Sequence, residues 1–313
     1  MFFLKQPIRG VNMINFTKME GIGNDGIYVD CTKQKIQNPG ELAYLICDRY
    51  FGIGANGLIL IFNSKIADFR IEIYNSDGSQ AEMCGNGIRC VGKFVYEKGL
   101  TNKTELEIET LAGIKRLKLN VENGIVKTVR ADMGEPIFEA EKIPVICDQK
   151  GDLKKIKLQA YDKQFEVTCV SVGNPHGVIF VKDVDEIDVR KYGQKMENDK
   201  AFPQKANIEF IEKLDNHNIR MRVWERGAGE TMACGTGACA STVASVLNKI
   251  TSNRVTVHLR GGSLLIEWNR EDNHIYMTGP AEITFEGTFD EDKYRANKIR
   301  DIYIKNANSF TKI

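Results

Sequence analysis

The sequence predicts an α+β protein made of two domains of the same fold, each with many strands around one buried helix. Three observations support this prediction: a long-range internal repeat, short segments of alternating apolar and polar residues, and one apolar helical segment in each half. The 313 residues are enough for two domains of ordinary size, each with a substantial core.

The internal repeat is the strongest of these observations. Residues 69–87 (FRIEIYNSDGSQAEMCGNG) align without a gap to residues 219–237 (IRMRVWERGAGETMACGTG), 150 positions downstream. The same offset aligns residues 16–24 (FTKMEGIGN) with residues 166–174 (EVTCVSVGN). A constant offset across about half of the chain indicates a gene duplication that produced two pseudo-symmetric domains.

Each half contains one clear apolar helical segment, and both segments begin at a cysteine. We expect helices over residues 84–98 and 234–249, and the second is built from small and apolar residues that favour burial. Shorter helices are expected over 41–49 and 184–192. Alternating segments predict half-buried strands at 69–75, 167–172, 177–181, 220–226 and 281–287.

We divide the chain into residues 1–13 as an N-terminal extension, 14–135 as the first domain and 136–279 as the second. In this division, residues 280–313 form a C-terminal strand region that can pack back on the first domain. The extension has a short apolar start followed by charge, so it lacks the apolar core of a secretory signal.

The composition excludes several classes of partner. Hydrophobic residues make up 42% and charged residues 27% of the chain, which is typical of a soluble globular protein. The net charge of +1 predicts no affinity for nucleic acid or for an anionic membrane surface. No apolar run approaches the roughly 20 residues that span a bilayer.

Eight cysteines occur without a close-set framework, which predicts free thiols in a reducing cytoplasm. Cys31, Cys47, Cys147 and Cys169 are expected to be small buried hydrophobes. No C-x-x-C pair is present, and the spacings around the other cysteines match no common zinc pattern. We therefore expect neither a metal nor an organic cofactor.

Two segments match the G-x-G-x-x-G pattern, at residues 21–26 (GIGNDG) and 52–57 (GIGANG). A dinucleotide site needs a strand before these glycines and a helix after them, but strand-like sequences follow both. We interpret the glycines as turn residues that bring backbone close to a ligand.

Cys84 and Cys234 each precede Gly-x-Gly at a helix start. A helix N-terminus lowers a thiol pKa from about 8.5 toward neutrality, and its free N–H groups bind anions such as carboxylates. Two such ends facing one another would hold a carboxylate between two thiols and stabilise the charge that develops when an α-proton leaves. One thiolate would remove the proton and the opposite thiol would return one, so the configuration inverts.

At this point the motifs resemble a known family. NSDGSQAEMCGNGIRC, VSVGNPHGVIFV, ERGAGETMACGTGACAS and the opening FTKMEGIGND are similar to diaminopimelate epimerase, over nearly the whole chain from Ile14 onward. Proline racemase and phenazine-type isomerases share the wider superfamily, with motifs that fit less well. The resemblance implies two β-barrel-like domains around central helices, a cytoplasmic homodimer, and conversion of LL- to meso-diaminopimelate in lysine and peptidoglycan biosynthesis.

The resemblance also implies roles for individual residues. Cys84 and Cys234 would be the acid–base pair, and His176 and Glu225 would assist them. Backbone N–H groups of Gly85, Asn86, Gly235 and Thr236 would bind the reacting carboxylate. The side chains that would hold the rest of the substrate are Asn24, Asn75, Asn174, Asn207 and Arg226.

The chain departs from the family pattern at Gly26, where a bulky aromatic is usual, and at Asn56 and Gly57, the latter often glutamine. These differences leave the pocket shape open. The alternatives are a racemase of the same fold acting on another amino acid, an epimerase of a related diamino diacid such as lanthionine, and a non-catalytic amino-acid-binding or thiol redox protein.

Overall fold

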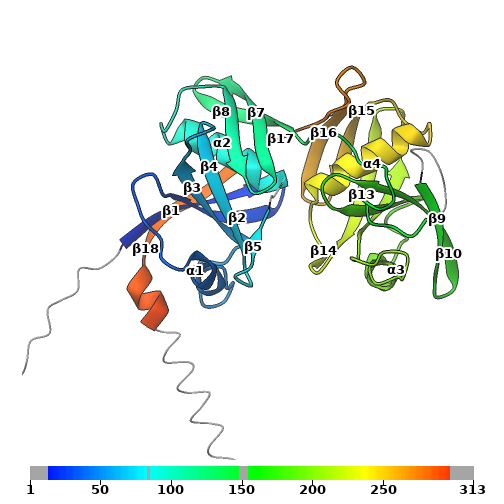
Figure 1. Cartoon of the computed structure of the whole chain (residues 1–313), viewed down its shortest axis with the longest axis horizontal. Helices are drawn as coiled ribbons and strands as arrows, with labels where there is room; N and C mark the ends of the chain where they lie inside the picture. Colours follow the sequence, from blue (N-terminus) through cyan, green and yellow to red (C-terminus); the bar gives the residue numbers. More distant parts are fainter. Residues whose placement is uncertain (1–12, 83–84, 148–153, 297–313) are drawn as a thin grey trace, which may run out of the picture.

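The computed structural model describes residues 13–82, 85–147 and 154–296. The chain forms two lobes, and each lobe wraps a mixed β-sheet around one helix, α2 (Gly85–Glu97) in the first and α4 (Gly235–Leu247) in the second (Figure 1). The predicted α+β architecture of two similar halves is therefore confirmed. Cys84 and Met83 lie outside the described residues.

The first lobe contains β1 (Met13–Gly21), β2 (Asn24–Asp30), α1 (Pro39–Ile46), β3 (Gly57–Asn63), β4 (Phe69–Asn75), β5 (Gln80–Ala81), β6 (Glu105–Thr110), β7 (Gly113–Glu122) and β8 (Ile125–Asp132). The second lobe contains β9 (Lys154–Ala160), β10 (Lys163–Ser171), β11 (Pro175–Val181), α3 (Val189–Glu197), β12 (Asn207–Lys213), β13 (Asn218–Glu225), β14 (Gly229–Glu230), β15 (Arg254–Leu259), β16 (Gly262–Trp268) and β17 (Ile275–Gly279). The last strand, β18 (Glu282–Asp290), returns to the first lobe and pairs with β1.

The strand order of the two lobes is the same. In the first lobe the order is β18–β1–β2–β3–β4–β6–β7–β8, and in the second it is β9–β10–β11–β12–β13–β15–β16–β17. The registers repeat as well, because Gly26 pairs with Gly57 and His176 pairs with Asn207, each 150 positions later. The duplication seen in the sequence is thus present in the strand pairing.

The two lobes are joined through their sheets. β8 pairs antiparallel with β17, which brings Asp132 opposite Tyr276 and makes one continuous sheet. The tip of the β1–β2 hairpin at Ile22 and Gly23 also packs against Gly261 and Met232 of the second lobe. The β8–β17 pairing and this hairpin contact together place the ends of α2 and α4 next to one another.

The first G-x-G-x-x-G segment crosses the β1–β2 turn and runs into β2, and the second leads from α1 into β3. Residues 21–24 form a two-residue β1–β2 hairpin turn, in which Ile22 and Gly23 both have positive φ (51° and 84°). Such φ values are those of a tight hairpin turn. Residues 52–57 connect the end of α1 to β3, with Gly54 at φ 80°. Neither segment opens a helix.

The short helix of the second lobe lies further along the chain than predicted. The sequence pattern indicated residues 184–192, but α3 begins at Val189 and ends at Glu197. The side chain of Asp188 accepts a hydrogen bond from the backbone N–H of Lys191, so this residue caps the helix start. The predicted range therefore ran five residues early because it overlooked the capping aspartate.

The central helices are buried because their residues are apolar or small. In α4 the run from Gly237 to Ser245 is buried on all sides, as predicted from its lack of a polar face. Cys47 and Cys169 are buried as expected, whereas Cys31 and Cys147 are only half-buried. In the described residues no helix is long and apolar enough to cross a membrane.

Candidate active site

The N-termini of α2 and α4 meet directly at the junction of the lobes. A methyl group added at Gly85 would lie 3.7 Å from Cα of Gly235, so the gap between the two helix ends is about the size of a methyl group. The side chain of Asn86 donates a hydrogen bond of 3.3 Å to the carbonyl of Ala233. Free N–H groups of both helices are therefore gathered at one place, as the sequence predicted for an anion site.

A buried arginine holds this junction in place. The guanidinium of Arg89 donates 2.9 Å to Oδ1 of Asn86, and its Nε donates 3.2 Å to the carbonyl of Pro280, where the chain returns to the first lobe. Arg89 is fully buried. Because it joins the start of α2 to the connection between lobes, the alignment of the two helix ends is fixed by side-chain contacts as well as by the sheet.

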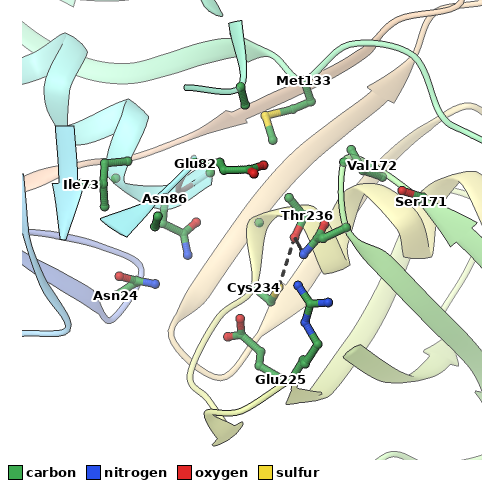
Figure 2. Close-up of a pocket in the computed structure, with 18 of the residues that line it drawn as sticks. Asn24, Ile73, Glu82, Asn86, Met133, Ser171, Val172, Glu225, Cys234 and Thr236 are labelled. Atoms are coloured by element: carbon green, nitrogen blue, oxygen red, sulfur yellow. Dashed lines mark hydrogen bonds between the residues drawn. The ribbon is translucent and has the colours of Figure 1, made fainter. Parts of the chain in front are cut away.

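A cavity of about 820 Å³ opens at this junction and is lined by both lobes. Figure 2 shows Asn24 and Asn86 on one side of it, with Glu225, Cys234 and Thr236 on the other. The predicted site residues that line it are Asn24, Asn75, Gly85, Asn86, Asn174, Glu225, Arg226, Cys234, Gly235 and Thr236. His176 and Asn207 are buried behind this wall, and Cys84 lies outside the described residues.

Cys234 is the N-cap residue of α4. Its sulfur accepts a hydrogen bond of 3.3 Å from the backbone N–H of Gly237 and lies 3.5 Å from the hydroxyl of Thr236. Burial nevertheless raises the thiol pKa well above its ordinary value, and the nearby carboxylates of Glu225 and Glu209 add to the shift. The expectation of a lowered pKa was wrong for this cysteine, because desolvation and two negative neighbours outweigh the helix end.

Glu225 lies beside this thiol at the end of β13. Its carboxylate accepts a short hydrogen bond from the hydroxyl of Thr231. Burial raises the pKa of Glu225, although hydrogen bonds from Thr231 and Cys234 act in the opposite direction. A buried carboxyl that contacts a thiol is suited to exchange a proton with it.

His176, the second residue of β11, is completely buried. Its Nδ1 lies 2.7 Å from Oε1 of Glu209 and its Nε2 lies 2.8 Å from Oδ1 of Asn174. Asn174 in turn donates 3.3 Å to Thr236 at the start of α4. The histidine is thus connected to the cavity through Asn174.

Sequence reasoning missed Glu209. It is fully buried on β12 and lies against Gly237, where an added methyl group would come within 2.8 Å of its Oε1. The sequence contains an indication of this residue, a single glutamate between Ile208 and Phe210 in an apolar strand. Burying a carboxyl group costs free energy unless it has a partner, so such a glutamate points to a buried polar contact.

The side chain of Asn207 links two backbone segments behind the cavity. Its amide oxygen accepts 2.8 Å from the backbone N–H of Arg226, and its nitrogen donates 3.2 Å to the carbonyl of Pro175. The guanidinium of Arg226 donates 3.0 Å to the carbonyl of Gln204, which leaves most of its N–H groups for other acceptors. Arg226 itself lines the cavity and is placed to bind an anion.

The first lobe contributes a charged cluster that the sequence analysis did not identify. Asp25 accepts two hydrogen bonds from Arg49, at 2.8 and 3.1 Å, and forms an ion pair with Lys18 at 2.9 Å. It also accepts from the backbone N–H of Asn56. Burial alone would raise the pKa of Asp25, but the bonds from Arg49 and Lys18 hold it below its ordinary value. The cluster fixes the rim that carries Asn24 and Asn56.

The two glycine departures are accommodated by close packing. An added methyl group at Gly26 would lie 2.6 Å from Cδ1 of Ile59 and 2.9 Å from the ring of Tyr28, so these side chains fill the space. At Gly57 it would lie 2.7 Å from the carbonyl of Tyr74. Tyr28, Asn56, Gly57 and Ile59 line the cavity.

In the described residues no group of three or more His, Cys, Asp and Glu side chains is arranged to hold a metal ion. The groups of this cavity that concern the reaction are the thiol of Cys234, the carboxyl group of Glu225, the guanidinium of Arg226 and the backbone N–H donors of the two helix ends.

Solved structures share this fold. A hydroxyproline epimerase from Agrobacterium vitis superposes with a TM-score of 0.67 at 13% identity, over 90% of this chain and 93% of that protein. A phenazine biosynthesis protein of the PhzF family from Bacillus anthracis superposes with a TM-score of 0.61 at 20% identity, over 88% of this chain and 99% of that protein. The chain therefore shares the fold of this epimerase and of this PhzF-family protein.

Sequence comparison is more specific. Residues 16–139 and 168–284 match the family described as Diaminopimelate epimerase. The diaminopimelate epimerase of Methanococcus maripaludis is 54% identical over 277 residues, covering 88% of this chain and all of that protein. That of Acetivibrio thermocellus is 55% identical over 277 residues, covering 88% of this chain and 99% of that protein. The chain belongs to the diaminopimelate epimerase family.

Proposed function

We propose that this protein converts LL-2,6-diaminopimelate to meso-diaminopimelate, by two-base proton transfer at one α-carbon. The observation that carries the proposal is the direct meeting of the N-termini of α2 and α4 at Gly85 and Gly235, with Cys234 at the start of one helix. The relatives at 54–55% identity carry the name of this activity. The product would serve lysine and peptidoglycan biosynthesis.

The reacting carboxylate binds to the N–H groups of Gly85, Asn86, Gly235 and Thr236 in this proposal. Both helix dipoles point their positive ends at it, so they stabilise the enolate-like charge that forms when the α-proton leaves. The thiolate of one cysteine takes that proton and becomes a thiol. The thiol of the other cysteine gives a proton to the opposite face and becomes a thiolate, so each turnover exchanges the two protonation states.

Cys84 and Cys234 are the two bases in this scheme. The raised pKa of Cys234 supports the thiol form for this residue, with Glu225 as its proton-exchange partner. The substrate ammonium group would lie close to Glu225 and offset its charge when the carboxylate is ionised. Asn24, Asn75 and Arg226 line the same cavity and are suited to the second amino-acid group, since an arginine binds a carboxylate bidentately.

We further propose that the protein acts in the cytoplasm as a homodimer, both of which rest on the family resemblance. Sedimentation velocity on the full chain tests the second point, and a monomer over micromolar concentrations would contradict it.

Exchange of the α-hydrogen in heavy water tests the reaction itself. Purified protein is incubated with LL-diaminopimelate, lanthionine, L-proline and L-histidine, and deuterium at Cα is measured by mass spectrometry. We expect exchange with diaminopimelate. Exchange with proline or histidine alone would show that the substrate is a different amino acid.

The cysteine variants test the mechanism. Cys84→Ala and Cys234→Ala should each abolish epimerisation, and the matched control Cys239→Ala, on a buried thiol in the same helix as Cys234, should keep it. Full activity in either of the first two would contradict the two-base scheme.

A further inference from the structure

The two halves of the site differ in their ionisable side chains, although their backbones correspond. In the second lobe, His176, Glu209 and Glu225 lie close to Cys234. The positions 150 residues earlier are Gly26, Ile59 and Asn75, and none of these titrates. At these three pairs of equivalent positions the ionisable side chains therefore all belong to the second lobe, and Glu209 is the one without an assigned role.

Glu209 is an isolated carboxylate inside the second lobe. Both the residue and its partner His176 are completely buried, and Oε1 lies 2.7 Å from Nδ1 of the histidine. The other oxygen, Oε2, has no hydrogen-bond partner among the described residues. A buried carboxyl oxygen without a partner is costly, so a single strong interaction must hold the group in place.

The start of α4 supplies a second stabilising feature. An added methyl group at Gly237 would lie 2.8 Å from Oε1 of Glu209 and 3.2 Å from the sulfur of Cys234. The first turn of α4, at the positive end of the helix dipole, therefore lies against the carboxyl group of Glu209. The missing side chain at Gly237 makes this approach possible.

The hydrogen bonds of His176 indicate its protonation. Nδ1 faces a carboxylate oxygen, and Nε2 faces the amide oxygen of Asn174 at 2.8 Å. The amide orientation is consistent with the Asn174 nitrogen donating to Thr236. A ring that donates to both of these oxygen atoms is in the imidazolium form. The other titratable groups that the described contacts place around the pair are Glu225 from β13 and Cys234 before α4.

We infer that Glu209 is a positioning residue that holds His176 as an imidazolium, and through Asn174 and Thr236 fixes the end of α4 that receives the substrate carboxylate. The inference rests on the proposed function. A positive charge buried behind the helix end adds to the electrostatic stabilisation of the developing carbanion. It also offsets the two carboxylates that flank Cys234.

The protonation state is measured directly by nitrogen NMR on the full chain labelled with ¹⁵N-histidine. The chain has only four histidines, and a His176→Gln sample assigns the signal of interest. We expect both ring nitrogens of His176 to be protonated at pH 7 in the wild type. We expect Glu209→Gln to convert the ring to a neutral tautomer. A neutral His176 in the wild type overturns the inference, even if the variant fails to fold.

A control variant and a rate measurement separate positioning from general structural damage. Glu212→Gln changes a glutamate on the same strand whose partners, Arg220 and the Val184 N–H, lie away from the cavity. We expect Glu209→Gln to lower kcat for diaminopimelate exchange about 100-fold with little change in KM, as for other buried carboxylates that orient a histidine. Glu212→Gln should stay within twofold of the wild type.

The outcomes distinguish this inference from the proposed function. If the wild type does not exchange diaminopimelate, the proposed function fails, and the NMR measurement still decides the state of His176. If Glu209→Gln folds, exchanges normally and keeps the wild-type pH profile, the positioning role is refuted while the proposed function stands.

Discussion

Replacing Gly235 with alanine tests whether the contact between the two helix ends is needed for catalysis. The added methyl group would lie 3.0 Å from the sulfur of Met277 and 3.2 Å from Oδ1 of Asn86. Both separations are several tenths of an ångström below normal contact. The methionine can move, but Asn86 is held by Arg89 and by the carbonyl of Ala233. The substitution therefore pushes the two helix ends apart.

The expected effect on stability is small and the effect on activity is large. Overpacking costs about 1–3 kcal/mol, and alanine in place of glycine in a helix regains about 0.5–1 kcal/mol. The net loss is then about 0–2.5 kcal/mol, which is less than the usual stability of a folded domain. A displacement near 1 Å costs roughly 100-fold in rate where groups must be held in register. We expect kcat/KM for diaminopimelate to fall by about that factor.

Gly85→Ala is the matched control at the other helix. Its methyl group would meet Met133 and Met277 at 3.4 and 3.5 Å and Gly235 at 3.7 Å, which are ordinary contacts. The backbone N–H is kept in both variants. We expect Gly85→Ala to lose less than tenfold in kcat/KM, measured by coupled assay or Cα exchange, with urea denaturation in parallel. Equal activity of the two variants would refute the argument that this contact sets the geometry.

Three further predictions concern single side chains. Arg226→Lys keeps the charge but loses the planar fork, so KM for diaminopimelate should rise about tenfold with kcat nearly unchanged; a change in kcat alone would contradict a binding role. Burial raises the pKa of Glu225, so ionisation of this side chain opposes folding. In urea denaturation, Glu225→Gln should be more stable than the wild type at pH 8 but not at pH 4. The same difference in stability at both pH values would contradict this. Burial would raise the pKa of Asp25, but bonds from Arg49 and Lys18 lower it. The ionised side chain therefore stabilises the folded protein above the ordinary pKa of aspartate, and this stabilisation is lost as the pH falls through the pKa of the folded state. Asp25→Asn should lose about 1.5–3 kcal/mol at pH 7, as expected for hydrogen bonds to a charged group, and less as the pH falls below the ordinary pKa of aspartate. A pH-independent loss would contradict the ion-pair assignment.

The features that sequence alone could predict are those set by local pattern and by the repeat. The start of each central helix follows from Gly-x-Gly after a cysteine, and the strand from Phe69 to Asn75 follows from strict alternation. Because the sequence repeats, each feature identified in one half also predicts its equivalent in the other half. By contrast, the start of α3 depends on one capping aspartate, Asp188, which a periodicity argument does not see.

The electrostatics of the site could not be predicted in the same way. A helix start argues for a lowered thiol pKa, but the actual shift at Cys234 depends on burial and on Glu209 and Glu225, which come from two different strands. Similarly, the resemblance gives Asn207 a role in holding the substrate, yet its side chain joins Pro175 to Arg226. These are properties of tertiary packing, and no spacing in the chain encodes them.

The comparison of the two lobes gives a physical reason why the backbone of the site could be predicted from the sequence and its electrostatics could not. Duplication preserved the backbone that binds a carboxylate, because the helix ends at Gly85 and Gly235 correspond and meet. It did not preserve the side chains behind them, since Ile59 stands where Glu209 stands in the second lobe. A substrate of either configuration can therefore use the same carboxylate site while the environment of its α-proton differs. The ratio of kcat/KM in the two directions is fixed by the equilibrium constant, but kcat itself is free to differ. We expect Glu209→Gln to lower kcat more in the direction that deprotonates through Cys234 than in the other. Equal falls of kcat in both directions would mean that the buried carboxylate acts on the common site and not on one face.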